Sequence, residues 1–189
     1  MTPTVGVVGD EPLVDSVTAA TPPTVEGGAD AIVGTDVDVV VAGGERAVLS
    51  LVRAGVDVPV LPVAAGRGLR SVPRDAVTDA VDRLDAGEVS TDTHALLDVA
   101  VSGTSVARAC FDVFLVTAEP AHISEYAVVA GEDPVTSLRA DGVVVATPAG
   151  TTGYAGAAGA PTIPPGPDVL AIVPVAPFST TKDHWVVPD

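Results

Sequence analysis

Residues 141–161 read DGVVVATPAGTTGYAGAAGAP, and the character of the sequence changes twice within them. The opening Asp-Gly pair predicts a turn, and Val143 to Ala146 form an apolar run typical of a short buried strand. Residues 147–153 are small and rich in hydroxyl groups, so we expect a loop whose backbone N–H groups stay uncovered. After Tyr154 come residues so small that another group could approach the backbone closely.

This succession supports two hypotheses. A strand that leads into hydroxyl groups, one aromatic ring and glycines favours a site for a sugar, a phosphate or a nucleobase. The alternative is structural: a strand, a tight loop and a closely packed helix of small residues. A glycine-rich loop alone does not separate the two hypotheses.

The order of these residues resembles a signature of the NAD kinase family. Residues 146–161, ATPAGTTGYAGAAGAP, align without gaps with the family's STPTGSTAYSLSAGGP, which also follows an Asp-Gly pair. Residues 173–189, VPVAPFSTTKDHWVVPD, are similar to a later family segment with a Pro-x-x-Pro strand and a Val-Pro-Asp ending. The family usually continues for several dozen residues past that ending, so the resemblance implies that this sequence lacks the family's C-terminal extension.

Charge is the most unusual feature of the composition. The chain has 189 residues, of which 25 are acidic and 9 basic, giving a formal net charge of −16. The acidic residues are spread along the chain, which favours a salt-adapted, halophilic protein over one with an acidic interaction patch. With no basic patch, we expect no nucleic-acid partner. Apolar residues make up 47% but aromatic residues only 3%, which favours tightly packed α/β layers.

The cysteine and histidine residues and the hydropathy pattern bear on disulfides, metal sites and membrane segments. The single cysteine, Cys110, excludes an internal disulfide and a multi-cysteine metal site, and its apolar neighbours predict a buried side chain. His94, His122 and His184 are dispersed, so we expect no protein metal site. Charged residues and prolines interrupt every apolar run, and no basic segment precedes one at the N-terminus. We therefore expect a cytoplasmic protein with no membrane partner.

The first half of the chain alternates between strand and helix patterns. The expected strands are 4–8, 36–41 and 58–63, and the expected helices are 45–54, ended by Gly55, and 72–87, with Val77, Val81 and Leu84 on one face. We expect weak helix at best at 13–20 and connecting material at 29–35. The alternation predicts a parallel, Rossmann-like α/β domain over residues 1–90.

The second half has the rhythm of an all-β unit. Strand-like runs, separated by Gly, Pro and Asp turns, occupy residues 94–103, 107–119, 125–132, 141–148 and 168–177. They predict a β-rich, sandwich-like domain over residues 91–189. The fold class is therefore α/β followed by β, and the NAD kinase resemblance implies the same plan.

The resemblance also implies roles for residues of the first half. The family's Gly-Gly-Asp-Gly-Thr signature falls at residues 43–47, which read GGERA. Gly43 and Gly44 match, and a Gly-Gly turn between a strand and a helix suits an anion, although packing alone also produces such turns. Glu45 keeps a carboxylate and is the implied catalytic residue. Arg46 replaces a glycine, either as a phosphate-binding cation or as a residue that fills space.

In the second half the resemblance implies contacts with a dinucleotide. Asp141 takes the position of a family aspartate at the nicotinamide riboside end. Thr152 and Tyr154 match hydroxyl and aromatic positions beside the dinucleotide. Asp112 takes the acidic position of a family Asn-Glu pair, whose asparagine is replaced by Phe111. The other implied contacts are Ala149, Gly153 and Ala157.

The implied reaction is phosphorylation of the adenosine ribose 2′-hydroxyl of NAD by ATP (or polyphosphate), which gives NADP. The implied ligands are NAD, ATP and the Mg²⁺ that arrives with ATP. Glu45 is the candidate for orienting the hydroxyl. Because the GGERA segment departs from the family, a second hypothesis is a dinucleotide-binding paralogue without catalysis. A third is a purely structural relative within an oligomer, and we expect a homo-oligomer.

Overall fold

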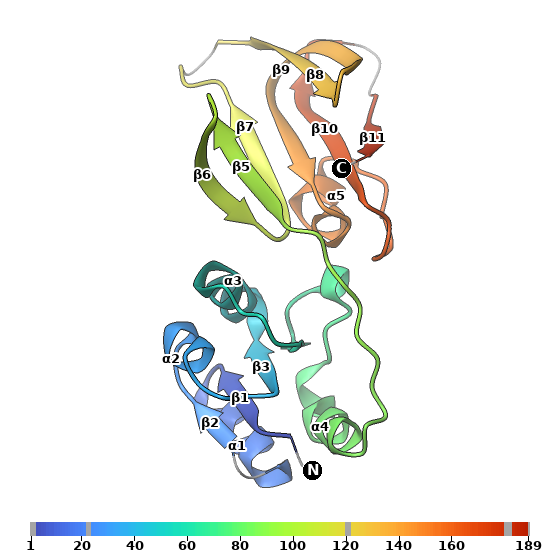
Figure 1. Ribbon diagram of the computed structural model, residues 1–189. Coiled ribbons are helices and arrows are strands. Elements are labelled where there is room, and N and C mark those ends of the chain that lie inside the picture. The colour runs from blue at the N-terminus through green and yellow to red at the C-terminus, as the bar shows by residue number, and fades with distance from the viewer. Residues whose placement is uncertain (1–2, 22–23, 120–121, 180–182, 189) are drawn as a thin grey trace. The chain divides into compact units, whose positions relative to one another are not determined.

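The protein divides into two compact units, Met1–Asp92 and Thr93–Asp189. The computed structural model (Figure 1) describes residues 3–21, 24–119, 122–179 and 183–188. Among these residues, no helix is long and apolar enough to cross a membrane.

The N-terminal unit is built on a parallel sheet of four strands in the order β2-β1-β3-β4. The strands are β1 (Val5–Val8), β2 (Thr24–Glu26), β3 (Val39–Gly43) and β4 (Val60–Val63). Every residue of β1 is buried, as are the first four of β3. Such uninterrupted burial requires cover on both faces of the sheet, which explains the near-continuous valine runs in the sequence.

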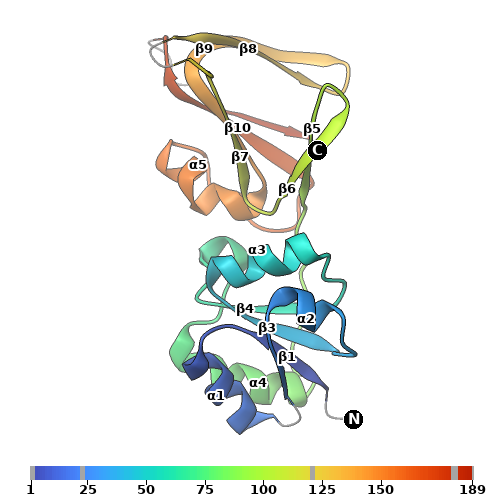
Figure 2. The same ribbon diagram turned by 90° about the vertical axis from the view of Figure 1, so that its left-hand side faces the viewer.

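Helices cover both faces of this sheet (Figure 2). Helices α1 (Glu11–Ala20) and α4 (Val77–Asp85) pack together on one face, and α2 (Ala29–Val33) and α3 (Gly44–Ala54) lie on the other. Two short 3₁₀ turns, η1 (Arg67–Leu69) and η2 (Arg74–Ala76), precede α4. The core under α1 and α4 consists of Val5, Val7, Leu13, Val17, Val39, Val41, Val63, Val77 and Val81. The predicted face of α4 is confirmed, because Val77 and Val81 are buried and Leu84 packs against them.

Two predictions for this unit are wrong. Residues 11–20 form a regular helix, stabilised by burial of Leu13 and Val17 rather than by helix propensity. Residues 29–33 are also helical, and Ile32 of α2 fills the space above Gly6 of β1. Strand β2 was missed. Both helices depend on contacts with distant segments, which local periodicity does not reveal.

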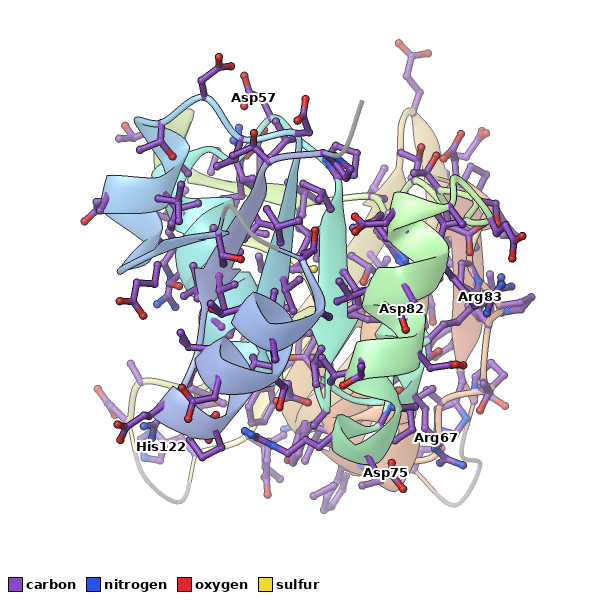
Figure 3. The ribbon with its side chains drawn as sticks, turned by 90° about the horizontal axis from the view of Figure 1, so that it is seen from below. Asp57, Arg67, Asp75, Asp82, Arg83 and His122 are labelled. Carbon is purple, nitrogen blue, oxygen red and sulfur yellow. The ribbon has the colours of Figure 1, made fainter. Side chains whose placement is uncertain are left out.

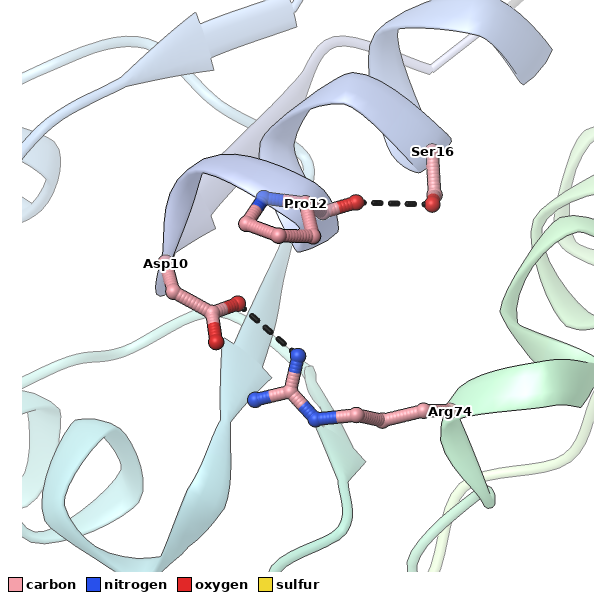
Figure 4. A network of polar contacts seen from close by, with 4 residues as sticks. All are labelled: Asp10, Pro12, Ser16 and Arg74. Carbon is pink, nitrogen blue, oxygen red and sulfur yellow. Dashed lines mark hydrogen bonds and ion pairs between the residues drawn. The ribbon is translucent and has the colours of Figure 1, made fainter.

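An exposed ion pair joins the residue before α1 to the turn η2, which precedes α4. Arg74 of η2 donates a hydrogen bond from Nη1 to Oδ1 of Asp10 at 2.8 Å, as Figure 4 shows. In the first turn, Pro12 fits a position whose N–H has no helical partner, and its carbonyl accepts a bond from the Ser16 hydroxyl at 2.8 Å. Asp10 is the N-cap residue, but its side chain caps no backbone N–H.

The predicted helix at 45–54 is confirmed as α3. It begins at Gly44 and ends at Ala54, and Gly55 follows in the left-handed conformation with φ of 79°. Glycine adopts this conformation without steric cost, which accounts for the helix end.

The C-terminal unit is an antiparallel assembly organised around one long strand. Its strands are β5 (Leu97–Val101), β6 (Thr104–Ala109), β7 (Asp112–Val116), β8 (Ser124–Ala130), β9 (Asp133–Ala146), β10 (Val169–Pro177) and β11 (Trp185–Pro188). The main sheet has the order β11-β10-β9-β7, β8 also pairs with β9, and β5-β6 form a separate hairpin. The first part of β9 pairs with β8, and its last part lies between β7 and β10.

The end of β9 contributes to two apolar clusters, one on each face. Val144 and Ala146 face the short helix α5 (Tyr154–Ala157) together with Ala155, Ala171 and Val173. Val143 and Val145 face the opposite way, where Ile172, Val187, Trp185 and residues of β8 pack. This alternation follows the two-residue period of a strand. An α/β unit followed by an antiparallel β-rich unit confirms the predicted fold class.

The predicted Asp-Gly turn at 141–142 is wrong, because both residues lie inside β9. Gly142 pairs with Val116 on one side and Val175 on the other. A Cβ at Gly142 would meet the Phe114 ring at 2.5 Å, so the glycine makes room for an aromatic ring and does not form a turn. The expected strand at 107–119 is in fact two strands, β6 and β7, which Cys110 and Phe111 separate.

Acidic side chains are distributed over the surface. Asp57, Asp75 and Asp82 are exposed, and Figure 3 shows them on a surface with many other carboxylates. Three aspartates pair with arginines: Asp92 with Arg70, Asp10 with Arg74 and Asp98 with Arg108. The side chains of these pairs are all about half exposed or more, so solvent screening leaves each pair little effect on stability.

Candidate functional site

The segment after β9 is a compact 3₁₀ turn, not an open loop. It forms η3 (Pro148–Thr152), and Thr147 is its N-cap residue. Gly150 N–H donates to the Thr147 carbonyl at 3.0 Å and to Thr147 Oγ1 at 3.3 Å. Gly153 N–H donates to the Gly150 carbonyl at 3.0 Å. The prediction of uncovered N–H groups is therefore wrong at Gly150 and Gly153, because the turn satisfies them internally.

Two threonine hydroxyls of this segment serve the fold. Thr147 is buried, and its hydroxyl donates to the Cys110 carbonyl at 2.7 Å. Thr151 is fully buried; its hydroxyl donates to the Pro148 carbonyl at 2.7 Å and accepts from Ile163 N–H at 3.0 Å. Buried polar groups need such partners, so these hydroxyls are not available to a ligand.

The glycine of the Thr-Pro-x-Gly order is also structural. Gly150 packs against the carbonyl of Phe111, where a Cβ would overlap the Phe111 backbone. The Thr147 N–H donates to the same carbonyl at 2.9 Å. The start of β7 and the turn η3 are therefore locked together through the backbone, and a side chain at position 150 would separate them.

The exposed part of the segment is Tyr154 with its neighbours in α5. The Tyr154 side chain is 49% exposed, and Ala157, one helical turn later, is exposed too. Together with Ala158 they form one wall of a cavity of about 280 Å³. The facing walls come from the end of β10, Pro174–Pro177, and from Asp183 and His184. This cavity is small, mostly apolar in lining and edged by a carboxylate and an imidazole, as ligand pockets commonly are.

Asp183 and His184 were not predicted as site residues. The dispersed histidines gave no signal, because His184 is far from Tyr154 in sequence. It reaches the cavity because β11, which directly follows His184, runs antiparallel to β10. The His184 ring lies close to Gly159, two residues after α5. A Cβ at Gly159 would meet His184 Cε1 at 3.0 Å.

The other predicted contacts of this unit have varied surroundings. Thr152 is half-buried, and its hydroxyl is 3.5 Å from the Ala149 carbonyl, a marginal hydrogen bond. Gly153 is exposed beside Tyr154, whereas Ala149 is 3% exposed and borders a second cavity of about 180 Å³. Asp141 is exposed within β9. Asp112 is half-buried at the start of β7, opposite Ala146.

The structure brings the predicted residues of the first half together at the end of β3. Gly43 ends the strand and is the N-cap of α3, and Gly44 begins the helix with φ of 79°. Glu45 and Arg46 are exposed in the first turn. Because no side chain caps this helix, its first N–H groups are open to an anion, which the helix dipole also favours.

Two details of this turn bear on the predicted roles. Glu45 Oε1 would lie 3.2 Å from a Cβ built on Gly66, so the carboxylate is close to the loop after β4. Ala47, at the position of a family threonine, is 7% exposed and belongs to the core. A hydroxyl at position 47 would therefore face the interior, while Glu45 and Arg46 remain accessible.

Hydrogen bonding and burial shift the pKa of three acidic groups, Asp10, Asp98 and Cys110. The Arg74 hydrogen bond lowers the pKa of Asp10, and the Arg108 hydrogen bond lowers the pKa of Asp98. Burial raises the pKa of the Cys110 thiol, which is 3% exposed as predicted. The described residues contain no cluster of three or more His, Cys, Asp or Glu side chains suited to a metal ion.

Known proteins match both the sequence and the fold. Residues 112–189 match the ATP-NAD kinase C-terminal domain. The NAD kinase of Methanosarcina barkeri is 41% identical over 92 residues, which are 49% of this chain and 34% of that protein. The NAD kinase of Methanopyrus kandleri is 31% identical over 159 residues, which are 82% of this chain and 58% of that protein.

The chain belongs to the NAD kinase family. The family resemblance of residues 146–161 is thus confirmed, and the matched region contains both η3 and the Tyr154 cavity. The chain spans between 34% and 58% of the length of these two curated relatives.

Solved NAD kinase structures share the fold. The yeast NADH kinase complexed with NADH matches with a TM-score of 0.74 at 21% identity. The match covers 98% of this chain and 69% of the yeast chain. The NAD kinase from Archaeoglobus fulgidus in complex with ATP has a TM-score of 0.77 at 20% identity, covering 98% of this chain and 76% of its own. At these identities the likeness establishes the architecture of the family, while the roles of single residues stay predictions.

Proposed function

We propose that the chain binds a nicotinamide adenine dinucleotide at the Tyr154 cavity and phosphorylates its adenosine ribose at the 2′-hydroxyl. The observation that supports this best is the cavity itself. Two of its lining residues, Tyr154 and Ala157, are dinucleotide positions by family resemblance, and both are exposed. The neighbouring hydroxyls of Thr147 and Thr151 are occupied within the fold, so ligand contacts fall to Thr152, Gly153 and Tyr154.

Phosphoryl transfer needs a group that receives the proton of the attacking hydroxyl. The ribose 2′-oxygen bonds to the γ-phosphorus of ATP while the bond from that phosphorus to the β–γ bridging oxygen breaks, and ADP leaves. We assign the proton of the 2′-hydroxyl to the exposed carboxylate of Glu45. The open N–H groups at the start of α3 and the Arg46 guanidinium are suited to the phosphate charge.

Mg²⁺ enters this proposal as a ligand of ATP. Mg²⁺ is usually held by one or two carboxylates together with substrate phosphates and water, rather than by a cage of protein ligands. When bound, it would neutralise charge on the transferring phosphoryl group.

NADP formation tests the reaction. Purified protein in molar KCl, given NAD or NADH, Mg²⁺ and either ATP or polyphosphate, should produce NADP or NADPH. Glu45→Ala should lower kcat by about 10²- to 10³-fold, as loss of one well-placed electrostatic group does. It should change the dinucleotide Kd far less than kcat, because the proposed contacts of Thr152, Gly153 and Tyr154 with the dinucleotide are kept. Wild-type protein no faster than the Glu45→Ala variant would refute catalysis by this route.

A second candidate is a dinucleotide-binding relative without phosphoryl transfer. Arg46 favours it, because its long side chain replaces a family glycine in the first turn of α3, where phosphates would approach the backbone. Calorimetry with NAD, NADP and ATP separates the candidates. Dinucleotide binding without turnover, together with turnover gained by Arg46→Gly, would identify Arg46 as the obstacle.

Two further expectations stay predictions. A homo-oligomer is expected, and size-exclusion chromatography with light scattering in molar KCl measures it. A cytoplasmic location is also expected, and fractionation of the source cells tests it.

A further inference from the structure

Two aromatic rings meet at the surface of the C-terminal unit. The ring centroids of Phe114 and Tyr154 are 5.5 Å apart, with the planes tilted by 44°. Phe114 is 42% exposed and Tyr154 is 49% exposed. The chain has three phenylalanines and two tyrosines, so two of its five Phe and Tyr rings form this half-exposed pair. Large aromatic side chains are usually buried, so in a chain with so few of them an exposed pair indicates a binding role more strongly than a buried pair would.

The backbone provides a place for the Phe114 ring. Phe114 of β7 lies opposite Val144 of β9, whose side chain faces α5, so the ring lies on the α5 face of the sheet. From there it extends over Gly142, where a Cβ would meet ring atoms at 2.5 and 3.0 Å. The ring therefore rests on a glycine backbone, with Tyr154 beside it.

This pair continues one wall of the cavity. Tyr154 lines the 280 Å³ cavity on one side and contacts Phe114 on the other. Gly142, beneath the Phe114 ring, pairs with Val175, which also lines the cavity. Phe114, Tyr154 and the cavity thus form one row across β7, β9 and β10 on a single face of the sheet.

We propose that Phe114 is a ligand-contacting residue that, together with Tyr154, forms a stacking platform for a planar ring of the bound dinucleotide. This inference rests on the proposed dinucleotide binding and adds a residue that no family motif supplied. Aromatic side chains hold bases by stacking, and tilted rings with open faces can receive one. The exposed part of the Phe114 side chain is apolar surface in contact with water, and a stacked ligand ring would remove it from water, which is favourable.

Binding measurements on ring variants test the platform. Phe114→Ala should weaken dinucleotide binding by about 5- to 150-fold, as loss of a stacking side chain typically does. Phe114→Leu, which keeps apolar contact with Gly142 but has no π face, should weaken it nearly as much. Phe114→Tyr should stay within about 3-fold of wild type, since it preserves the ring. The matched control is Phe178→Ala, which removes a ring that is 71% exposed and does not line the cavity.

Titration with parts of the ligand shows which ring is held. AMP carries the adenine, nicotinamide mononucleotide carries the nicotinamide, and ribose 5-phosphate carries neither. Phe114→Ala should weaken whichever mononucleotide stacks and leave ribose 5-phosphate binding unchanged. Equal loss for all three probes would show that Phe114 only supports the shape of the unit, and would overturn the proposal.

Nuclear magnetic resonance gives a direct readout that a purely structural role would not produce. With three phenylalanines, the Phe114 ring signals can be identified as those missing in Phe114→Leu. Magnetisation transfer between these signals and ligand ring protons is expected on binding. Wild-type protein that binds dinucleotide without this transfer, and Phe114→Ala with unchanged affinity, would overturn the platform alone. Wild-type protein that binds no dinucleotide would overturn the platform and the proposed binding together.

Discussion

Replacing Thr151 by valine should destabilise the C-terminal unit, although the two side chains have nearly the same shape. Thr151 is fully buried, and its hydroxyl both donates to the Pro148 carbonyl at 2.7 Å and accepts from the Ile163 N–H at 3.0 Å. Valine fills the same space with a methyl group, so no cavity forms. The expected loss comes from the two hydrogen bonds alone.

The magnitude follows from what each partner loses. A net intramolecular hydrogen bond contributes about 0.5–1.5 kcal/mol, and leaving a buried donor without an acceptor costs about 1–3 kcal/mol. Ile163 is half-buried, so water can partly replace the lost acceptor and the cost lies at the low end of that range. We therefore expect the free energy of unfolding to fall by about 2 kcal/mol. With a urea m-value of about 2 kcal/mol/M, the midpoint should fall by about 1 M.

Trp185 makes the measurement specific to this unit. It is the single tryptophan of the chain and lies in β11, so its fluorescence follows unfolding of the C-terminal unit. Urea unfolding in constant molar KCl is the assay. Thr152→Val is the matched control, because its hydroxyl is 3.5 Å from its acceptor and should contribute less than about 0.5 kcal/mol. A Thr151→Val midpoint equal to that of wild type or of the control would show that the buried hydroxyl does not stabilise the turn.

Two further predictions concern charge. The free energy of unfolding should fall as KCl is lowered from molar to about 0.1 M, because repulsion within a chain of net charge −16 is less screened. Replacing the exposed Asp57, Asp75 and Asp82 by asparagine should reduce this dependence on salt. If the free energy of unfolding of the triple variant changes with KCl as steeply as that of wild type, the electrostatic explanation is contradicted. The lowered pKa of Asp10 and of Asp98 means that the stability each contributes is present above the ordinary carboxyl pKa of 3.8 and is lost as pH falls through the lower folded value. Acid unfolding below about pH 4 should therefore be less steep in Asp10→Asn and Asp98→Asn than in wild type, with exposed Asp82→Asn as control.

Sequence patterns predicted the elements whose signal is local. Strands β1 and β3, helix α3 with its glycine end and the buried face of α4 each depend on apolar spacing over a few residues. Helix α1 was expected only as weak helix over residues 13–20, and helix α2 and strand β2 were not predicted. Their stability comes from contacts such as Leu13 and Val17 with the core and Ile32 with Gly6, which no local pattern records.

The candidate site was predicted in part for the same reason. Tyr154 and Ala157 were identified because they lie within one contiguous signature. Phe114, Asp183 and His184 come from β7 and from the segment before β11, and they reach Tyr154 only through strand pairing. The turn predicted at residues 141–142 was wrong, because the sequence does not distinguish a glycine needed for close approach of a ring from one needed for a turn.

The internal hydrogen bonds of Thr147 and Thr151, and the backbone contact of Gly150, have an evolutionary consequence. These residues stabilise the fold, so purifying selection on stability alone would preserve most of the Thr-Pro-x-Gly-Thr-Thr order. A lineage that had ceased to phosphorylate its ligand would still carry a recognisable signature. Glu45 and the rings of Phe114 and Tyr154 are exposed, so they would drift once their function was lost. Among orthologues, retention of these exposed side chains is therefore the better record of activity.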